Sequence, residues 1–176
     1  PMDNPLLTMD GPGGLPAWDR IRPEHVKPAV DELLAQADAA LERAVSAEVP
    51  ADYDALSAVL DTATERLSRS WGAVRHLNAV MDTPELRAAY TENLPRITEF
   101  HTRLGADERL FAKYKAVLAS PQAASLSAAR RKALSNAVRD FVLSGAELQG
   151  AAKERFAQIQ ERQAELSRRF SEHVLD

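Results

Sequence analysis

The stretch from Leu56 to Met81, LSAVLDTATERLSRSWGAVRHLNAVM, decides the fold class of this chain. Apolar residues recur in it at spacings of three and four, which is the repeat of one face of an α-helix. These apolar positions are Leu56, Leu60, Ala63, Leu67, Trp71, Val74, Leu77 and Met81. The repeat runs through Gly72, although a glycine inside a helix costs about 1 kcal/mol relative to alanine. We therefore expect one helix over residues 56–81, with a neighbouring backbone or ring close to Gly72.

Prolines separate this helix from the beginning of the chain. Four of the ten prolines and three of the seven glycines fall within residues 1–16, a composition typical of loops. Pro28 inside a helix would cost about 3 kcal/mol, but proline is tolerated at the first helical position. We expect an extended N-terminal arm over residues 1–22 and a helical domain over residues 23–176. Within that domain, a short turn at 23–27 should precede a helix from Pro28 to about Ser46.

Capping residues and helix stops mark the helices that follow. In chain order these signals are Thr83 with Pro84, Asp107, Pro121, Ser125 or Ser127, and Gly145. The last helix should begin near Ala151, and its apolar stripe reaches Val174 without a stop signal, so we expect that helix to continue in a longer chain. Alternating apolar and polar residues never persist. The predicted fold class is all-α, an antiparallel bundle of long helices with little or no strand.

Composition limits the possible functions. Apolar residues make up 45% of the 176 residues and charged residues 27%, and the formal net charge is −4, so the chain is globular and carries no basic surplus for nucleic acid. No apolar run approaches the roughly 20 residues that cross a membrane. The absence of cysteine excludes disulfides and thiolate metal sites and fits a reducing compartment. We expect a cytoplasmic protein that binds neither nucleic acid nor membranes.

Catalytic and metal-binding motifs are missing from the sequence. A helical zinc site of the protease type needs H-E-x-x-H, yet none of the four histidines precedes a glutamate, and no two are three or four residues apart. Those histidines are His25, His76, His101 and His173. No serine sits in a G-x-S-x-G elbow, and no glycine-rich loop carries the lysine of a phosphate site. We therefore assign no catalytic, metal-binding or cofactor-binding residue, and the substrate-binding residues stay unknown.

His76 is the histidine with the clearest alternatives. The simpler interpretation is a partly buried imidazole that is hydrogen-bonded to a neighbouring group near the end of its helix. The functional interpretation is a residue that lines a peptide groove together with Asn78 and Arg87. Composition favours the first interpretation.

Several segments resemble one known family. They are NPLL at 4–7, LPAWDRIRPEHVKPAV at 15–30, WGAVRHLNAVMDTPELRAAYTENLP at 71–95, NAVRDFVLSGAEL at 136–148 and RFAQIQERQAELSRRFSEHVLD at 155–176. Together they resemble the N-terminal region of the thimet oligopeptidase family of zinc-dependent peptidases, in the order of that family. The resemblance implies a helical lobe that forms one wall of a substrate channel. It also implies that the zinc motif lies far downstream, beyond the residues present here.

Two functions from different classes follow. In the first, this chain is the N-terminal lobe of a zinc oligopeptidase that hydrolyses short peptides. It is then inactive alone, holds no cofactor itself, and has as its partner the catalytic part of its own polypeptide. In the second, it is a free-standing helical interaction or dimerisation module, because the stripe of residues 56–81 could also serve a coiled coil. An independent small enzyme is the weakest alternative, since no set of residues supports it.

Overall fold

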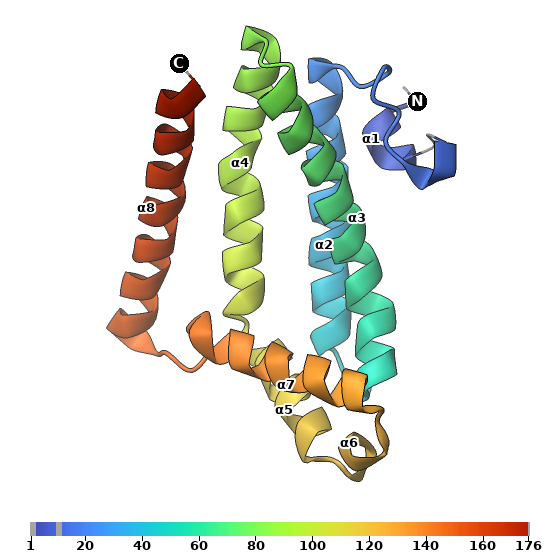
Figure 1. The fold of residues 1–176 in the computed structure, drawn as a ribbon. Helices are drawn as coiled ribbons and strands as arrows, with labels where there is room; N and C mark the ends of the chain where they lie inside the picture. The colour runs from blue at the N-terminus through green and yellow to red at the C-terminus, as the bar shows by residue number, and fades with distance from the viewer. Residues whose placement is uncertain (1–2, 10–11, 176) are drawn as a thin grey trace. The chain divides into compact units, whose positions relative to one another are not determined.

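The computed structural model describes residues 3–9 and 12–175, and all regular structure in those two ranges is helical. In chain order the elements are α1 (Pro5–Thr8), the 3-10 helix η1 (Pro12–Gly14), α2 (Pro23–Val45), α3 (Tyr53–Val80), α4 (Pro84–Gly105), α5 (Glu108–Ala119), α6 (Pro121–Ser125), α7 (Ala128–Leu143) and α8 (Gly150–Leu175) (Figure 1). The all-α fold class is thus confirmed. No helix in these ranges combines the length and the apolar character needed to cross a membrane.

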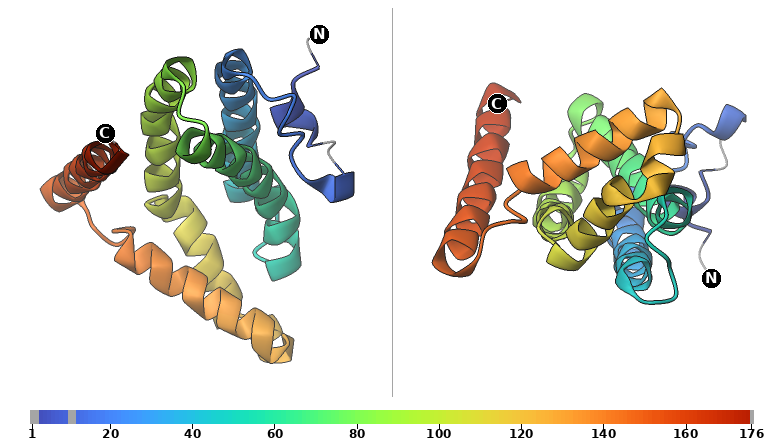
Figure 2. Two further views of the ribbon diagram at one scale, coloured as in Figure 1. Left: turned by 45° about the horizontal axis from the view of Figure 1, so that its top comes forward. Right: turned by 90° about the horizontal axis from the view of Figure 1, so that it is seen from below.

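The chain divides into two compact units, the first of which comprises residues 1–44 and 57–96. Trp71 on α3 stacks on Tyr90 on α4, with ring centroids 5.1 Å apart and planes inclined by 8°. Arg66 on α3 donates to the Oε1 of Gln36 on α2 at 2.6 Å. Helix α3 runs antiparallel to α2 and to α4, as Figures 1 and 2 show. The fully buried residues of this unit include Val26, Leu33, Leu41, Leu67 and Val74.

The N-terminal residues are fastened to the first unit by hydrogen bonds to the main chain. Where we expected an extended arm, residues 5–8 form α1, because the side chain of Asn4 accepts from the N–H of Leu6 at 3.0 Å and caps the turn. The Nδ2 of Asn4 also donates to the carbonyl of His25 at 2.9 Å. Arg69 donates to the carbonyl of Gly14 at 2.7 Å. This segment is therefore part of the packed unit.

The second unit comprises residues 45–56 and 97–176. Phe141 on α7 contacts Phe111 and Tyr114 on α5, with ring centroids 5.6 and 5.5 Å apart, so α7 lies against α5 (Figure 2). The ammonium group of Lys113 donates to the carbonyl of Ser46 at 2.5 Å and to that of Val49. Helix α5 therefore holds the loop that follows α2.

Helix α2 begins at Pro23 rather than at Pro28, which lies inside it. Pro28 cannot donate a hydrogen bond to the carbonyl four residues earlier, but it stands close to the start of the helix. Val26 is completely buried on the same short segment. His25 adds a cap, because its Nδ1 accepts from the N–H of Arg22 at 2.9 Å. Burial and capping outweigh the lost bond, so the predicted turn at 23–27 was wrong.

Helix α3 confirms the long apolar stripe and corrects two details. A Cβ added at Gly72 would meet nothing within 4 Å, so the close neighbour expected there is absent and the ring contact belongs to Trp71. Helix α3 ends at Val80, so Met81 lies beyond it, and Met81 is 61% exposed.

The predicted capping residues are confirmed. The hydroxyl of Thr83 accepts from the N–H of Leu86, Asp107 caps α5, and Ser127 caps α7. Pro121 follows the last residue of α5 by two positions and opens α6. Helix α8 begins at Gly150, one residue before the expected start.

Candidate functional site

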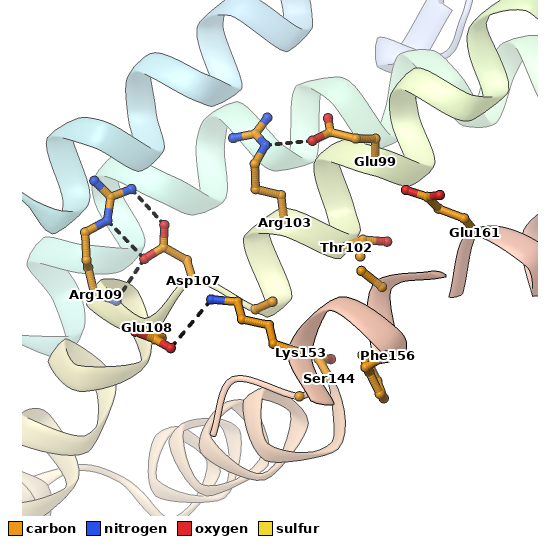
Figure 3. A pocket seen from close by; sticks show the side chains of 13 residues that line it. Glu99, Thr102, Arg103, Asp107, Glu108, Arg109, Ser144, Lys153, Phe156 and Glu161 are labelled. Atoms are coloured by element: carbon orange, nitrogen blue, oxygen red, sulfur yellow. Dashed lines mark hydrogen bonds and ion pairs between the residues drawn. The ribbon is translucent and has the colours of Figure 1, made fainter. Parts of the chain in front are cut away.

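A cleft of about 470 Å³ lies in the second unit, where the ends of four helices meet. Its lining comes from the C-terminal half of α4, the start of α5, the turn after α7 and the first turns of α8 (Figure 3). The first and last of these segments are more than forty residues apart in the sequence. The turns between the helices bring them together.

The turn after α7 depends on Gly145, whose φ is +85°, a left-handed angle that favours glycine. Its N–H donates to the carbonyl of Val142 at 3.1 Å, and the N–H of Ala146 donates to that of Phe141 at 2.9 Å, which are the two bonds of a Schellman cap. A Cβ at Gly145 would lie 3.0 Å from the ring of Phe156. Glycine is thus required both by the backbone angle and by the ring, and the turn places Phe156 in the cleft.

The end of α4 meets the end of α7 at Gly105 and Ser144. A Cβ added at Gly105 would lie 3.2 Å from both Cβ and Oγ of Ser144, tighter than most such contacts. A small residue at position 105 therefore allows the two helix ends to share one wall of the cleft.

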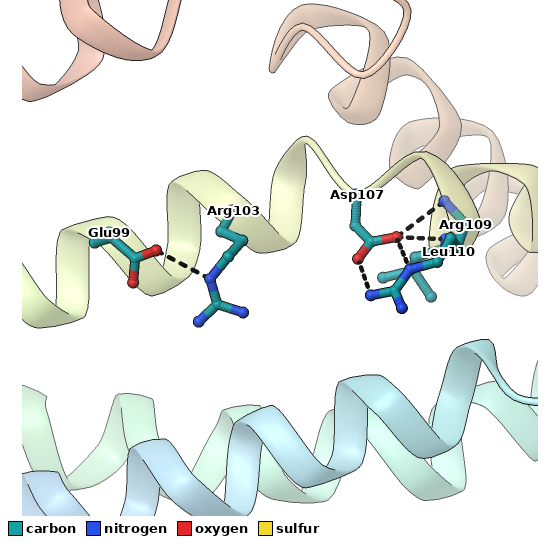
Figure 4. A network of polar contacts seen from close by, with 5 residues as sticks. All are labelled: Glu99, Arg103, Asp107, Arg109 and Leu110. Atoms are coloured by element: carbon teal, nitrogen blue, oxygen red, sulfur yellow. Dashed lines mark hydrogen bonds and ion pairs between the residues drawn. The ribbon is translucent and has the colours of Figure 1, made fainter. Parts of the chain in front are cut away.

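Asp107 sets the start of α5 and part of the charge of the cleft. Its Oδ1 accepts from the N–H groups of Arg109 at 2.9 Å and Leu110 at 3.1 Å, and its Oδ2 accepts from the Arg109 guanidinium at 2.8 Å (Figure 4). Burial by itself raises the pKa of Asp107, but the hydrogen bonds from Arg109 and Leu110 outweigh it and hold the pKa below the usual value of 3.8. The carboxylate is therefore ionised at neutral pH.

Two further ion pairs line the cleft. Arg103 donates to Glu99 at 3.0 Å along α4, and the ammonium group of Lys153 on α8 lies 3.5 Å from the carboxylate of Glu108 on α5 (Figures 3 and 4). All four side chains are more than 40% exposed, so each pair contributes at most about 1 kcal/mol to stability. Their role in the cleft is to present balanced positive and negative charge.

The lining of the cleft combines apolar and charged side chains. Phe156, Ala157 and Ala106 supply an apolar wall beside the ion pairs. The hydroxyl groups among the lining residues are those of Thr102 and Ser144, and the lining includes no histidine that could activate them. Such a surface can accept a segment that carries both apolar and polar groups.

The three residues considered as a peptide groove lie in the first unit, outside this cleft. His76 is exposed, not partly buried as expected, and its ring lies 5.1 Å from that of Trp18. Arg87 forms a two-point pair with Asp82, whose pKa it lowers. Asn78 is half-buried, and among the described residues its Oδ1 has no hydrogen-bond partner. Arg87 is thus paired with Asp82 at the start of its own helix. Among the described interactions, none joins His76, Asn78 and Arg87 to one another.

The remaining histidines are spread over separate elements. His25 caps α2, His101 lies on α4 with its ring against Phe100, and His173 is exposed on α8. Burial lowers the pKa of His101. Within residues 3–9 and 12–175, no three histidine, aspartate or glutamate side chains gather closely enough to hold a metal ion.

Sequence reasoning missed the cleft, although it found two of the residues that build it. Asp107 and Gly145 were recognised as a helix cap and a helix stop, but nothing in a one-dimensional pattern shows that they lie close together. The one available signal was that these breaks flank helices carrying both aromatic and charged residues near their ends.

Comparison with known proteins gives consistent matches over the whole chain. The family model described as the N-terminal domain of neurolysin and thimet oligopeptidase matches residues 30–153. Oligopeptidase A of Salmonella typhimurium and that of Escherichia coli are each 39% identical over 175 residues. A probable cytosolic oligopeptidase A of Arabidopsis thaliana is 39% identical over 173 residues. These alignments cover 98–99% of this chain, which spans about a quarter of the length of the relatives (24–25%).

Proposed function

The chain belongs to the family of the neurolysin and thimet oligopeptidase N-terminal domain, and from this premise we propose that it is the N-terminal helical lobe of a zinc-dependent oligopeptidase that hydrolyses short peptides. The observation that carries the proposal is the 39% identity to two bacterial oligopeptidases A over 99% of this chain. The proposed domain division is an N-terminal segment over residues 1–22 and the lobe over residues 23–176, with the catalytic domain following in the complete enzyme.

In this proposal the lobe shapes access to the substrate channel and does not cleave peptides itself. The sequence contains no H-E-x-x-H motif, and the described side chains offer no set of zinc ligands, so they do not fit the metal that the family implies. We therefore assign zinc and the bond-breaking step to the rest of the polypeptide and derive no step through the metal here. The cleft beside Phe156, with its balanced charges, is the part of the lobe best suited to contact a peptide.

The proposed location is the cytoplasm. A chain without cysteine suits a reducing compartment, and one relative is named a probable cytosolic oligopeptidase A.

A chimeric enzyme tests the proposed function. The quarter of Escherichia coli oligopeptidase A that aligns with this chain is replaced by residues 1–176, and hydrolysis of short peptides is measured with and without a chelator. We expect chelator-sensitive hydrolysis by the chimera and none by the 176-residue chain alone. The matched control lacks the aligned quarter altogether. A soluble, folded chimera that is no more active than this control would refute the proposal, as would peptide hydrolysis by the isolated chain.

A further inference from the structure

Helix α8 is less buried than the other long helices. None of its side chains from residue 150 to residue 174 is fully buried, and Phe156 is half-buried, whereas α2 alone buries seven residues. Large apolar side chains nevertheless lie on it: Ile159 is 49% exposed, Leu166 50%, Phe170 71% and Val174 68%. These four residues, the α8 stripe, are separated by seven, four and four positions, which puts them on one face of the helix. An apolar face of this kind marks a surface made for a partner.

Ion pairs occupy the faces of α8 that lie beside the stripe and opposite to it. Arg162 pairs with Glu165 at 2.6 Å, Arg169 pairs with the same carboxylate at 3.1 Å, and Arg168 pairs with Glu172 at 2.6 Å. These ion pairs lie within the helix and join three arginines to two glutamates. Lysine and arginine outnumber glutamate on α8 by only five to four, so the helix offers no strong positive charge to a nucleic acid or an anionic surface. The part of α8 that stays uncovered is the apolar stripe.

The comparisons indicate which part of a longer chain could cover the α8 stripe. The match to the N-terminal domain family ends at residue 153, and α8 begins at Gly150, so nearly all of α8 lies beyond the matched residues. The relatives nevertheless align with α8, and three quarters of their length lies outside the alignment. We propose that the α8 stripe is the docking face for this remaining part of an oligopeptidase A chain, which meets it with an apolar surface. The inference rests on the proposed function and adds the place at which the two parts join.

Hydrogen exchange in the chimera described above tests this docking. We expect the amides of residues 156–174 to exchange at least about tenfold more slowly in the chimera than in the isolated chain, because docking covers the stripe and suppresses local opening. Phe170→Glu and Leu166→Glu should each remove this protection. Both positions are half or more exposed, so the helix still forms in the isolated variants, as circular dichroism would verify. The matched control is Gln158→Glu, which adds the same charge at an exposed position away from the stripe.

The outcomes separate the docking from the enzymatic proposal. An active chimera with unprotected α8 amides, or one in which Phe170→Glu behaves like Gln158→Glu, overturns the docking alone. An inactive chimera in which the stripe is protected supports the docking and refutes the function. An insoluble chimera, when the unmodified Escherichia coli protein is soluble, counts against the docking because the stripe would remain uncovered. A stable dimer of the isolated chain that Phe170→Glu dissociates assigns the stripe to a second copy and also overturns it.

Discussion

At the scale of single residues, helix ends determine how the second unit is built. Gly145 has a left-handed backbone angle and lies against the ring of Phe156, and Asp107 satisfies two N–H groups at the start of α5. Both residues were identified from the sequence, because glycine and aspartate have well-defined preferences at helix termini. Their neighbours in the cleft could not be identified, since Lys153 and Glu108 are ordinary surface residues until folding brings them together.

Replacing Asp107 should change both the stability of the chain and its response to acid. Asp107→Ala removes the cap of α5 and should lower the free energy of unfolding by about 1 kcal/mol at neutral pH. The folded-state pKa of Asp107 lies below 3.8, so its ionised form stabilises the fold above that pH, and this contribution is lost as the pH falls through the folded pKa. Urea unfolding measured from pH 7 down to pH 3 would show both effects.

Asp107→Asn is the control for this experiment. Asparagine still accepts hydrogen bonds at the cap position but carries no charge to titrate. It should keep most of the neutral-pH stability and show a weaker dependence on pH below 4. If the aspartate and asparagine forms lose stability identically as the pH falls, the carboxylate of Asp107 does not have the role assigned to it.

At the scale of elements, helix positions follow from apolar periodicity, and errors arise where a local cost competes with burial. The apolar stripe predicted a helix over residues 56–81, and α3 spans Tyr53–Val80. Pro28 misplaced the start of α2, because its cost was weighed without the gain from burying Val26. Gly72 suggested a close neighbour, but none lies within 4 Å of a Cβ built there. The sequence of one helix does not show which of its residues face a neighbouring helix.

Among the contacts between elements, we expect the loss of those made by Lys113 to lower the stability most. Its ammonium group donates to the carbonyls of Ser46 and Val49 and so joins α5 to the loop after α2. Lys113→Met keeps the apolar stem and removes both charged hydrogen bonds, which should cost about 2 kcal/mol. Thermal unfolding would reveal this loss, with Lys132→Met, at an exposed position on α7, as the matched control. Equal melting temperatures for the two variants would show that the contact contributes nothing.

At the scale of the whole molecule, the described residues form two units without a metal-binding group. Sequence predicted the fold class and the family, because both depend on patterns distributed over the whole chain. It could not predict the cleft, which depends on the meeting of helix ends. It also left the substrate-binding residues unknown, because no motif in the sequence marks them.

The isolated chain should not bind zinc stoichiometrically. Protein zinc sites use roughly three or four side-chain ligands, and no group of that size is present in the described ranges. Titration calorimetry of the 176-residue chain with zinc chloride should give no saturable one-to-one binding, whereas the chimera serves as the metal-binding control. A tight single site on the isolated chain would show that a ligand set had been overlooked.

The placement of the two tryptophans has a practical consequence for all these measurements. Trp18 lies beside His76 and Trp71 is stacked on Tyr90, and both belong to residues 1–44 and 57–96. Intrinsic fluorescence excited at the indole band therefore reports on only one half of the polypeptide. The half that carries the cleft and α8 is optically silent in such an experiment, and a tryptophan introduced there would be needed to follow it.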